Sequence, residues 1–236
     1  MILPSHIKGI ISWFSGGTKK PDTKQPIERK PEHSEEMDVI NIQKPMMSLM
    51  AGKPTEENMR MLFELNVGSE DEENLRRKIY FSWFLATMPK EYRTSIDCES
   101  LAEKIGIPAN QTVDDCVKYC TTSINKYPNG AFQHCMLGKC MNRLELDEDS
   151  IRCFTKAIEL APDIAVIHLL RANAYGLIEE VDEGLKDART AISLDPNCYF
   201  ELLTIPFTTN EDTGSKYIRT AKQILSALEK RKARKK

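Results

Sequence analysis

The chain has 236 residues, of which 41% are hydrophobic and 29% are charged, and its formal net charge is -2. These totals allow one sizeable hydrophobic core together with a polar tail. They exclude a strong global attraction to nucleic acid or to an anionic membrane, so any such binding has to come from a local cluster of charge.

The cysteine content indicates a reducing environment. The chain holds 7 cysteines, an odd number, with no C-x-x-C pair, and its first residues do not follow the pattern of a secretory signal peptide. Its apolar runs are far shorter than the roughly 20 residues that span a bilayer. We therefore expect free thiols and a cytoplasmic location, with a nuclear or a membrane-associated location as alternatives.

Residues 1–54 are predicted to form a mostly disordered arm with a short apolar N-terminal segment. The arm is rich in Lys, Pro, Glu, Thr and Gln, which bury too little apolar area to offset the entropy of ordering. Within residues 1–14, Ile7, Ile11 and Phe14 recur with helical spacing. This segment either packs on the body or stays mobile, or it is a membrane anchor or an organelle-targeting presequence.

Residues 55–96 are predicted to form an amphipathic helical lead-in. Thr55 can cap a first helix, and Ser69 with Glu72 fits a capping box ahead of a second helix that ends near Pro89.

Two further helices are expected beyond this lead-in. The first is short, is lined by Leu101 and Ile105 and ends at Gly106. The second follows Thr112, and its spacing puts five small or apolar residues on one side: Val113, Cys116, Val117, Cys120 and Ile124.

An internal repeat of 34 residues gives the clearest signal in the sequence. Pro128, Pro162 and Pro196 are each 34 residues apart, and the similar phrases KAIELAPD and TAISLDPN contain the last two of them. Ala157 and Ala191 occupy the same place in these phrases. The recurrence predicts that a helix ends at the same point in each unit.

These residues resemble the tetratricopeptide repeat family, whose unit is a helix-turn-helix of 34 residues. The family's pattern of small and large residues is matched in a unit numbered from Ala131 by Leu137, Gly138, Phe154, Ala157 and Pro162. In a unit numbered from Ala165 it is matched by Ala172, Tyr175, Ala191 and Pro196.

The resemblance implies an all-α fold, a right-handed superhelical stack of helix-turn-helix hairpins with a C-terminal capping helix. It divides the chain into a divergent repeat at 97–130, tetratricopeptide repeats at 131–164 and 165–198, and a capping helix with a basic tail at 199–236. The capping helix is expected over about residues 214–232, and residues 199–203 are a candidate start of another first helix.

The resemblance also implies protein binding in a groove lined by the first helix of each unit. Lys139 and Arg143, one turn apart, are expected to be exposed and to hold a carboxylate or an acidic peptide, with Asn173 donating to its backbone. A solvated charged face is the alternative. The family's groove places fall on Phe132, Cys135, Lys139, Asn142, Arg143, Val166, Leu169, Asn173, Gly176 and Leu177.

Chaperone-binding members of the family grip a C-terminal carboxylate with a clamp of Lys, Asn and Arg side chains. Carried across, the clamp places fall on Cys135, Lys139, Leu170, Phe200 and Thr204, so the clamp is missing. A co-chaperone-like protein without the clamp stays an alternative.

The chain ends in a basic run. It is either a nuclear localisation signal or a contact for an acidic surface such as RNA, or it stabilises and solubilises the end of a helix. The overall charge does not favour nucleic acid as the main partner, so a nuclear or RNA-linked protein that uses the basic run is a weaker alternative. The run comprises Lys230, Arg231, Lys232, Arg234, Lys235 and Lys236.

The chain shows no Gly-rich phosphate loop, no G-x-S-x-G and no H-E-x-x-H motif. We therefore expect a non-catalytic adaptor or scaffold without a cofactor. His134 and His168 occupy the same place in successive units and are expected to be structural, with a metal pair or a pH switch as the alternative. The cysteines lack the spacing of a four-ligand zinc site and are expected to be small buried hydrophobes, so no metal site is predicted.

Overall fold

The computed structural model describes residues 71–88, 98–201 and 218–235. The predicted arm at 1–54, the helix expected after Thr55 and Ser69 lie outside these residues. None of the described helices is both long enough and apolar enough to cross a bilayer. The helices are α4 Glu72–Thr87, α6 Cys98–Ile105, α7 Val113–Lys126, α8 Ala131–Arg143, α9 Asp147–Leu160, α10 Ala165–Leu177, α11 Val181–Leu194 and α13 Ala221–Arg234, and two strands are β1 Tyr199–Glu201 and β2 Ile218–Thr220.

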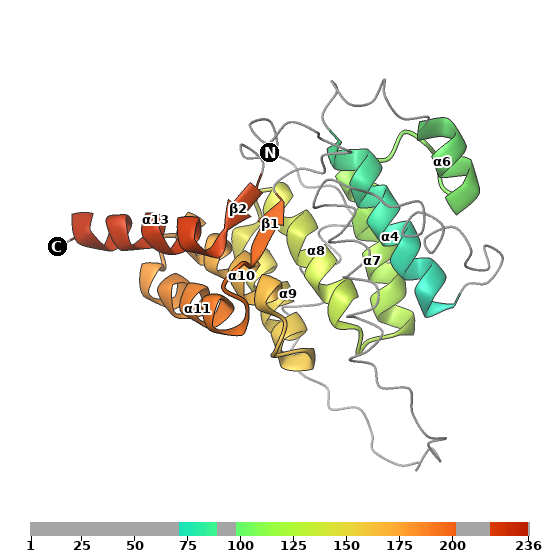
Figure 1. Cartoon of the computed structure of the whole chain (residues 1–236). Coiled ribbons are helices and arrows are strands. Elements are labelled where there is room, and N and C mark those ends of the chain that lie inside the picture. Colours follow the sequence, from blue (N-terminus) through green and yellow to red (C-terminus); the bar gives the residue numbers. More distant parts are fainter. Residues whose placement is uncertain (1–70, 89–97, 202–217, 236) are drawn as a thin grey trace, which may run out of the picture.

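Two consecutive helical hairpins form the regular part of the stack (Figure 1). Helix α8 packs on α9, α10 packs on α11, and α9 contacts α10. Each helix of the second hairpin begins and ends 34 residues after its counterpart in the first. The turns also match, because Glu145 and Glu179 have φ angles of 61° and 63°, in the left-handed region. The predicted all-α stack of repeated hairpins is confirmed.

The N-terminal hairpin is built differently from the prediction. Helix α7 pairs with α4, and α6 is an inserted helix that packs on α4 instead of being the first helix of a repeat. The insertion is fixed to α4 by a buried hydrogen bond in which the Ser82 hydroxyl donates to Gln111 Oε1 at 2.6 Å. The expectation that residues 97–130 form a hairpin of their own is therefore wrong, because the helix that pairs with α7 is α4 and not α6.

The helix boundaries follow from local signals. The Asn74 backbone N–H donates to Asp71 Oδ1 at 2.9 Å, so Asp71 caps α4. Thr112 caps α7 in a capping box with Asp115. Gly106, which follows α6, has a φ angle of +73° that a side chain would disfavour.

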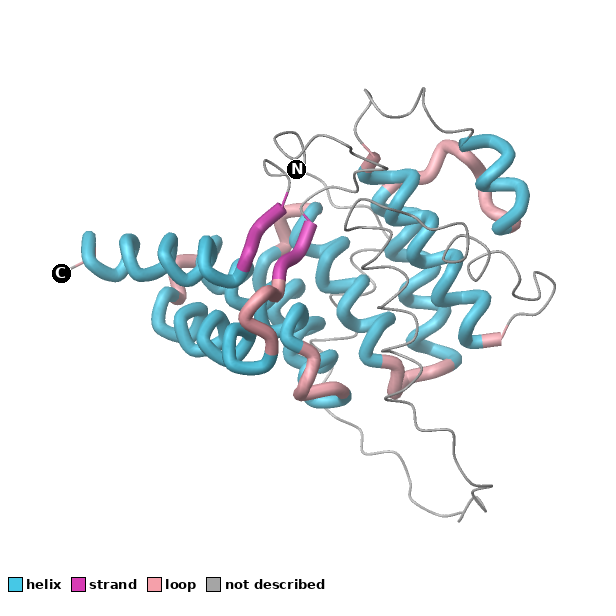
Figure 2. The backbone as a smooth tube through the Cα atoms, in the orientation of Figure 1, coloured by secondary structure: helices cyan, strands magenta, loops and turns pink. Residues whose placement is uncertain are grey.

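The C-terminal region contains a feature that was not predicted, an antiparallel pair of short strands (Figure 2). Tyr199 pairs with Thr220 and Glu201 with Ile218, so residues 199–201 form a strand and do not start a helix. Aromatic and β-branched residues favour an extended chain at these positions. Helix α13 begins at Ala221, capped by Thr220, and not near residue 214.

Helix α13 closes the stack by packing on α11 and α10. Its Leu228 is buried and lies against Gly176 and Gly184, where a Cβ atom would come within 3.0 Å and 3.2 Å of Leu228 methyl carbons. The two glycines thus permit the close approach of α13. The end of the last hairpin would otherwise expose an apolar surface.

Candidate functional site

The residues that the sequence predicts for partner binding lie on α8 and α10, the first helices of the two regular hairpins, and α4 extends this face. Helix α8 contacts α4 on one side and α10 on the other. We call the exposed and partly exposed residues of these three helices the first-helix face.

The predicted groove residues differ in exposure. Arg143 and Leu177 are exposed, and the side chain of Leu177 is 50% accessible. Leu169 is completely buried and Gly176 is buried against α13, so neither is available to a partner and their assignment to the groove is wrong. The partly exposed residues are Phe132, Cys135, Lys139, Asn142, Val166 and Asn173.

Several of the partly exposed residues already have structural contacts. Phe132 packs against the two N-terminal core clusters, and Cys135 and Val166 pack against the C-terminal one. Asn142 Nδ2 donates to Asp147 Oδ1 at 2.8 Å and so fixes the turn between α8 and α9. These four side chains support the stack as well as bordering its surface.

Lys139 is less exposed than the sequence suggests. Its ammonium group lies 4.8 Å from the centroid of the Trp83 ring on α4, in a cation–π contact that joins the first two hairpins. Arg143 and Asn173, in contrast, make no hydrogen bond or ion pair within the part of the chain that the structure describes. The expectation that Lys139 and Arg143 are both exposed holds for Arg143 alone.

The basic tail is partly used by the fold. Arg231 donates to the Gly176 carbonyl at the end of α10, and Lys232 pairs with Asp182. Lys235 pairs with Glu179 at 3.1 Å. These contacts hold α13 on the last hairpin, while Lys236 lies outside the described residues. These contacts support the interpretation that the basic run stabilises the end of a helix.

The two repeated histidines link successive units. The Nε2 atoms of His134 and His168 lie 3.1 Å and 2.8 Å from the carbonyl oxygens of Pro128 and Pro162, to which each imidazole donates. Each histidine, the fourth residue of its unit, is therefore tied to the proline near the end of the preceding unit. His168 Nδ1 also faces Asp187 at 3.5 Å.

The two histidines differ in pKa. The hydrogen bond to Asp187 raises the pKa of His168, whereas burial lowers the pKa of His134. A pKa that is raised in the folded state stabilises the fold at pH values below the unfolded-state pKa, and this contribution is lost as pH rises through the folded-state pKa. His168→Gln is therefore expected to cost more stability at about pH 5.5 than at about pH 8. Urea unfolding at the two pH values measures the difference.

His134→Gln provides the matched comparison for this prediction. Its depressed pKa makes protonation unfavourable to the fold, so its replacement is expected to cost less at the lower pH than at the higher one. Equal costs at both pH values for His168→Gln would contradict the assigned interaction with Asp187.

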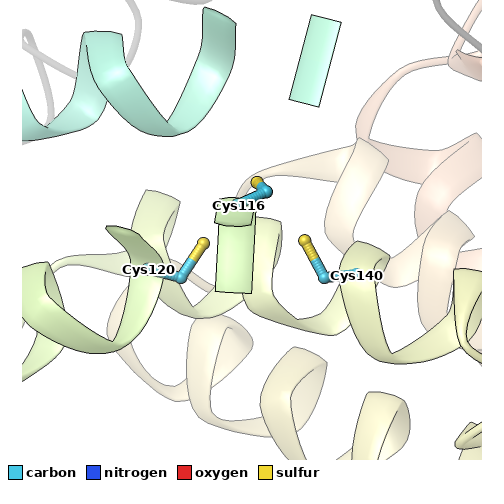
Figure 3. A group of neighbouring side chains, drawn as sticks. All are labelled: Cys116, Cys120 and Cys140. Carbon is cyan, nitrogen blue, oxygen red and sulfur yellow. The ribbon is translucent and has the colours of Figure 1, made fainter. Parts of the chain in front are cut away.

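A cluster of three cysteines lies between α7 and α8, and we call it the cysteine cluster. The sulfur atoms of Cys116, Cys120 and Cys140 are all within 4.8 Å of one another, and all three residues are fully buried. Figure 3 shows the three side chains converging from the two helices. Cys135, which the sequence places on the same hairpin, is not among them.

The cluster has an unusual electrostatic environment. Hydrogen bonds from Cys120 and Cys140 lower the pKa of Cys116 to about 5, helped by the positive charge of Lys139. Burial raises the pKa of Cys120 and of Cys140 well above the ordinary value.

The sequence shows that Cys116 and Cys120 are one helical turn apart, but it does not indicate that Cys140 lies next to them. The link depends on how α7 packs on α8, which no motif encodes. The repeat register was the available signal, since it fixes which turns of neighbouring helices meet.

The geometry defines an all-α protein of stacked helical hairpins with a capped C-terminal end. The 34-residue offset of helices, turns and prolines is the arrangement of tetratricopeptide repeats.

Comparison with known proteins gives one local sequence match. A segment of 53 residues is 42% identical to the Small glutamine-rich tetratricopeptide repeat-containing protein 2 of Saccharomyces cerevisiae. The match covers 22% of this chain and spans only 15% of that relative. No protein-family model matches the chain.

Several solved structures align with a large part of this chain. The TPR2B domain of yeast Sti1 in a pHsp70 complex is 18% identical, with 69% of this chain and 98% of that chain covered and a TM-score of 0.42. The Yersinia enterocolitica type III secretion chaperone SycD in complex with a YopD peptide is 12% identical, with 72% and 99% covered and a TM-score of 0.44. The Arabidopsis OM64 TPR domain is 18% identical, with 60% and 96% covered and a TM-score of 0.40.

Proposed function

We propose that this protein is a non-catalytic adaptor that binds a peptide or helix of a protein partner on its first-helix face. The observation that carries the proposal is the pair Arg143 and Asn173, on neighbouring first helices, which have no partner within the described residues. Leu177, exposed on α10, adds an apolar contact on the same helix as Asn173.

These three side chains supply the chemistry that peptide recognition needs. A guanidinium group binds a carboxylate with two parallel hydrogen bonds, and a side-chain amide can pair with a peptide backbone. An apolar residue beside such groups buries area without adding a charge to desolvate. We therefore propose an acidic segment with at least one apolar side chain as the ligand.

The position of Lys139 refines this picture. Because its ammonium group is held over Trp83, it adds positive potential to α8 from a fixed place. A fixed charge attracts an acidic ligand without the entropy cost of ordering a free lysine side chain. As part of the same proposal we place the adaptor in the cytoplasm, since all the cysteines are free thiols.

The proposal predicts that Arg143→Glu combined with Asn173→Ala weakens partner binding by about tenfold or more, because a paired charge and a backbone contact are lost together. Proximity labelling and affinity capture with the full-length protein identify partners that the variant loses. Titration of the recovered partner segment then measures the affinity of each protein. Neither substitution removes a contact that the fold uses, so the thermal midpoint is expected to stay unchanged.

Lys186→Glu combined with Thr122→Ala is the matched control. The two residues are exposed on the second helices α11 and α7, and the pair makes the same change of charge. An unchanged partner list for the first-helix variant, or an equal loss in the control, would place binding on another part of the chain. The N-terminal segment of residues 1–14, proposed as a membrane tether in the alternative, lies outside the described residues.

A further inference from the structure

The repeat does not require cysteine at the three places that the cysteine cluster occupies. The residues 34 positions after Cys116, Cys120 and Cys140 are Ser150, Phe154 and Ala174, which occupy the equivalent places at the next interface between hairpins. These three equivalent places are buried without a sulfur atom. Three cysteines at one interface therefore call for an explanation beyond the small side chains that the repeat requires.

The surroundings of the cluster are closed and mostly apolar. Its sulfurs share a core with Met136, Leu137 and Met141, and α4 lies across them. The Cys116 thiol donates to the Ile79 carbonyl of α4 at 3.4 Å. The side chain of Lys139, one residue before Cys140, brings a positive charge near the rim of the cluster.

The number and type of ligand atoms select the kind of ion. Thiolates are soft ligands, which favour Cu(I), zinc and iron–sulfur clusters over hard cations. Structural zinc takes four ligands, and within the described residues no fourth sulfur, imidazole or carboxylate joins the three sulfurs. Cu(I), a soft ion without a demand for a fourth ligand, is satisfied by three sulfurs.

We propose that Cys116, Cys120 and Cys140 form a trigonal thiolate site for a Cu(I) ion. Sulfurs within 4.8 Å of one another need only small side-chain rotations to meet a common ion at a bonding distance of about 2.3 Å. The ion enters as Cu(I), the thiol protons leave to solvent and no electron is transferred. Three thiolates and one Cu(I) leave two negative charges, which the nearby Lys139 ammonium partly offsets.

The site joins α7 to α8 and hence the first hairpin to the second. A bound ion would therefore stabilise the part of the stack where α4 and α7 pack on α8, while α10, α11 and α13 share a separate core cluster. Metal binding to the folded state alone raises the thermal midpoint. This inference is independent of the first-helix face, because none of the three sulfurs is exposed.

The test uses the full chain, reduced and under strict exclusion of oxygen, with Cu(I) supplied by the chromophoric chelator bicinchoninate. The wild-type protein is expected to withdraw one Cu(I) per chain from the chelator. Cys116→Ser, Cys120→Ser and Cys140→Ser are each expected to weaken Cu(I) binding by about a hundredfold or more, because each removes a direct ligand. X-ray absorption at the copper edge of the loaded wild type is expected to show sulfur ligands only.

Cys153→Ser is the matched control, because Cys153 is fully buried in the same core but is not part of the cluster. It is expected to keep wild-type affinity. Equal loss in Cys153→Ser, oxygen or nitrogen ligands in the absorption spectrum, or Zn²⁺ held by the three cysteines in place of Cu(I) would overturn the proposal. The spectrum of the wild type decides the matter even if a variant does not fold, as checked by circular dichroism.

Discussion

Replacing Asp187 by alanine is expected to lower the free energy of unfolding by about 3 kcal/mol or more. Asp187 is buried on α11 and accepts hydrogen bonds from Arg171 Nε at 2.6 Å and Arg171 Nη2 at 2.9 Å. The substitution leaves a largely buried guanidinium group with only the Thr155 hydroxyl as a side-chain hydrogen-bond partner. It also removes the carboxylate that faces His168. Urea unfolding at neutral pH measures the loss.

Arg189→Ala is the control for this prediction. Arg189 pairs with Glu229 at 3.7 Å on the surface, where both side chains are more than half exposed, so its loss is expected to cost well under 1 kcal/mol. Adding Arg171→Ala to Asp187→Ala should recover part of the stability, since no buried charge is then left unpaired. A cost for Asp187→Ala as small as that of the control would contradict the pairing.

The Arg171–Asp187 pair makes the stability of the last hairpin depend on pH. Burial raises the pKa of Asp187, but the hydrogen bonds from Arg171 and His168 outweigh it, and the net pKa is lowered. The stabilising contribution of Asp187 is therefore present above the unfolded pKa of about 3.9 and is lost as pH falls through the folded value.

Gly138→Leu is expected to destabilise the protein by about 3 kcal/mol through overpacking. A Cβ atom at Gly138 would lie 2.6 Å from Cε1 of the Phe154 ring, and that ring is fully buried between α8 and α9. The close approach of the two helices depends on the absence of a side chain at this point. Thermal unfolding followed by circular dichroism measures the shift.

Two comparisons isolate the cause. Ala227→Leu introduces the same side chain on an exposed face of α13 and is expected to leave the midpoint nearly unchanged. Phe154→Ala in the Gly138→Leu background should recover part of the loss, because it empties the space that the leucine needs. An unshifted midpoint for Gly138→Leu alone would show that the two helices do not meet there.

The regular hairpins could be predicted because their signals are local and repeated. The prolines at one place and the small residues at another recur every 34 residues, so each unit supports the interpretation of the next. Gly138 and Phe154 both fall on places of the family's pattern of small and large residues, and the structure brings them into contact. The capping residue Thr112 needed only its nearest neighbours in sequence.

The parts that could not be predicted depend on contacts between distant segments. The inserted helix α6 has the length and spacing of a poor first helix, and only the packing of α4 on α7 shows that it is not one. Leu169 has the groove position of the family, yet the tight packing of α10 with its neighbours buries it. The convergence of Cys140 with two cysteines of α7 likewise requires the geometry of two helices.

The inserted segment between α4 and α7 also bears on the order in which the chain folds. The helices of the later hairpins are joined by residues 144–146 and 178–180, whereas α4 ends at Thr87 and α7 begins only at Val113. Closing the longer connection costs more chain entropy, so the later hairpins are expected to assemble first and α4 to dock last. Until α4 docks, Cys116 lacks the Ile79 carbonyl above it. A nascent chain therefore has a period in which the three sulfurs can still be reached from solvent.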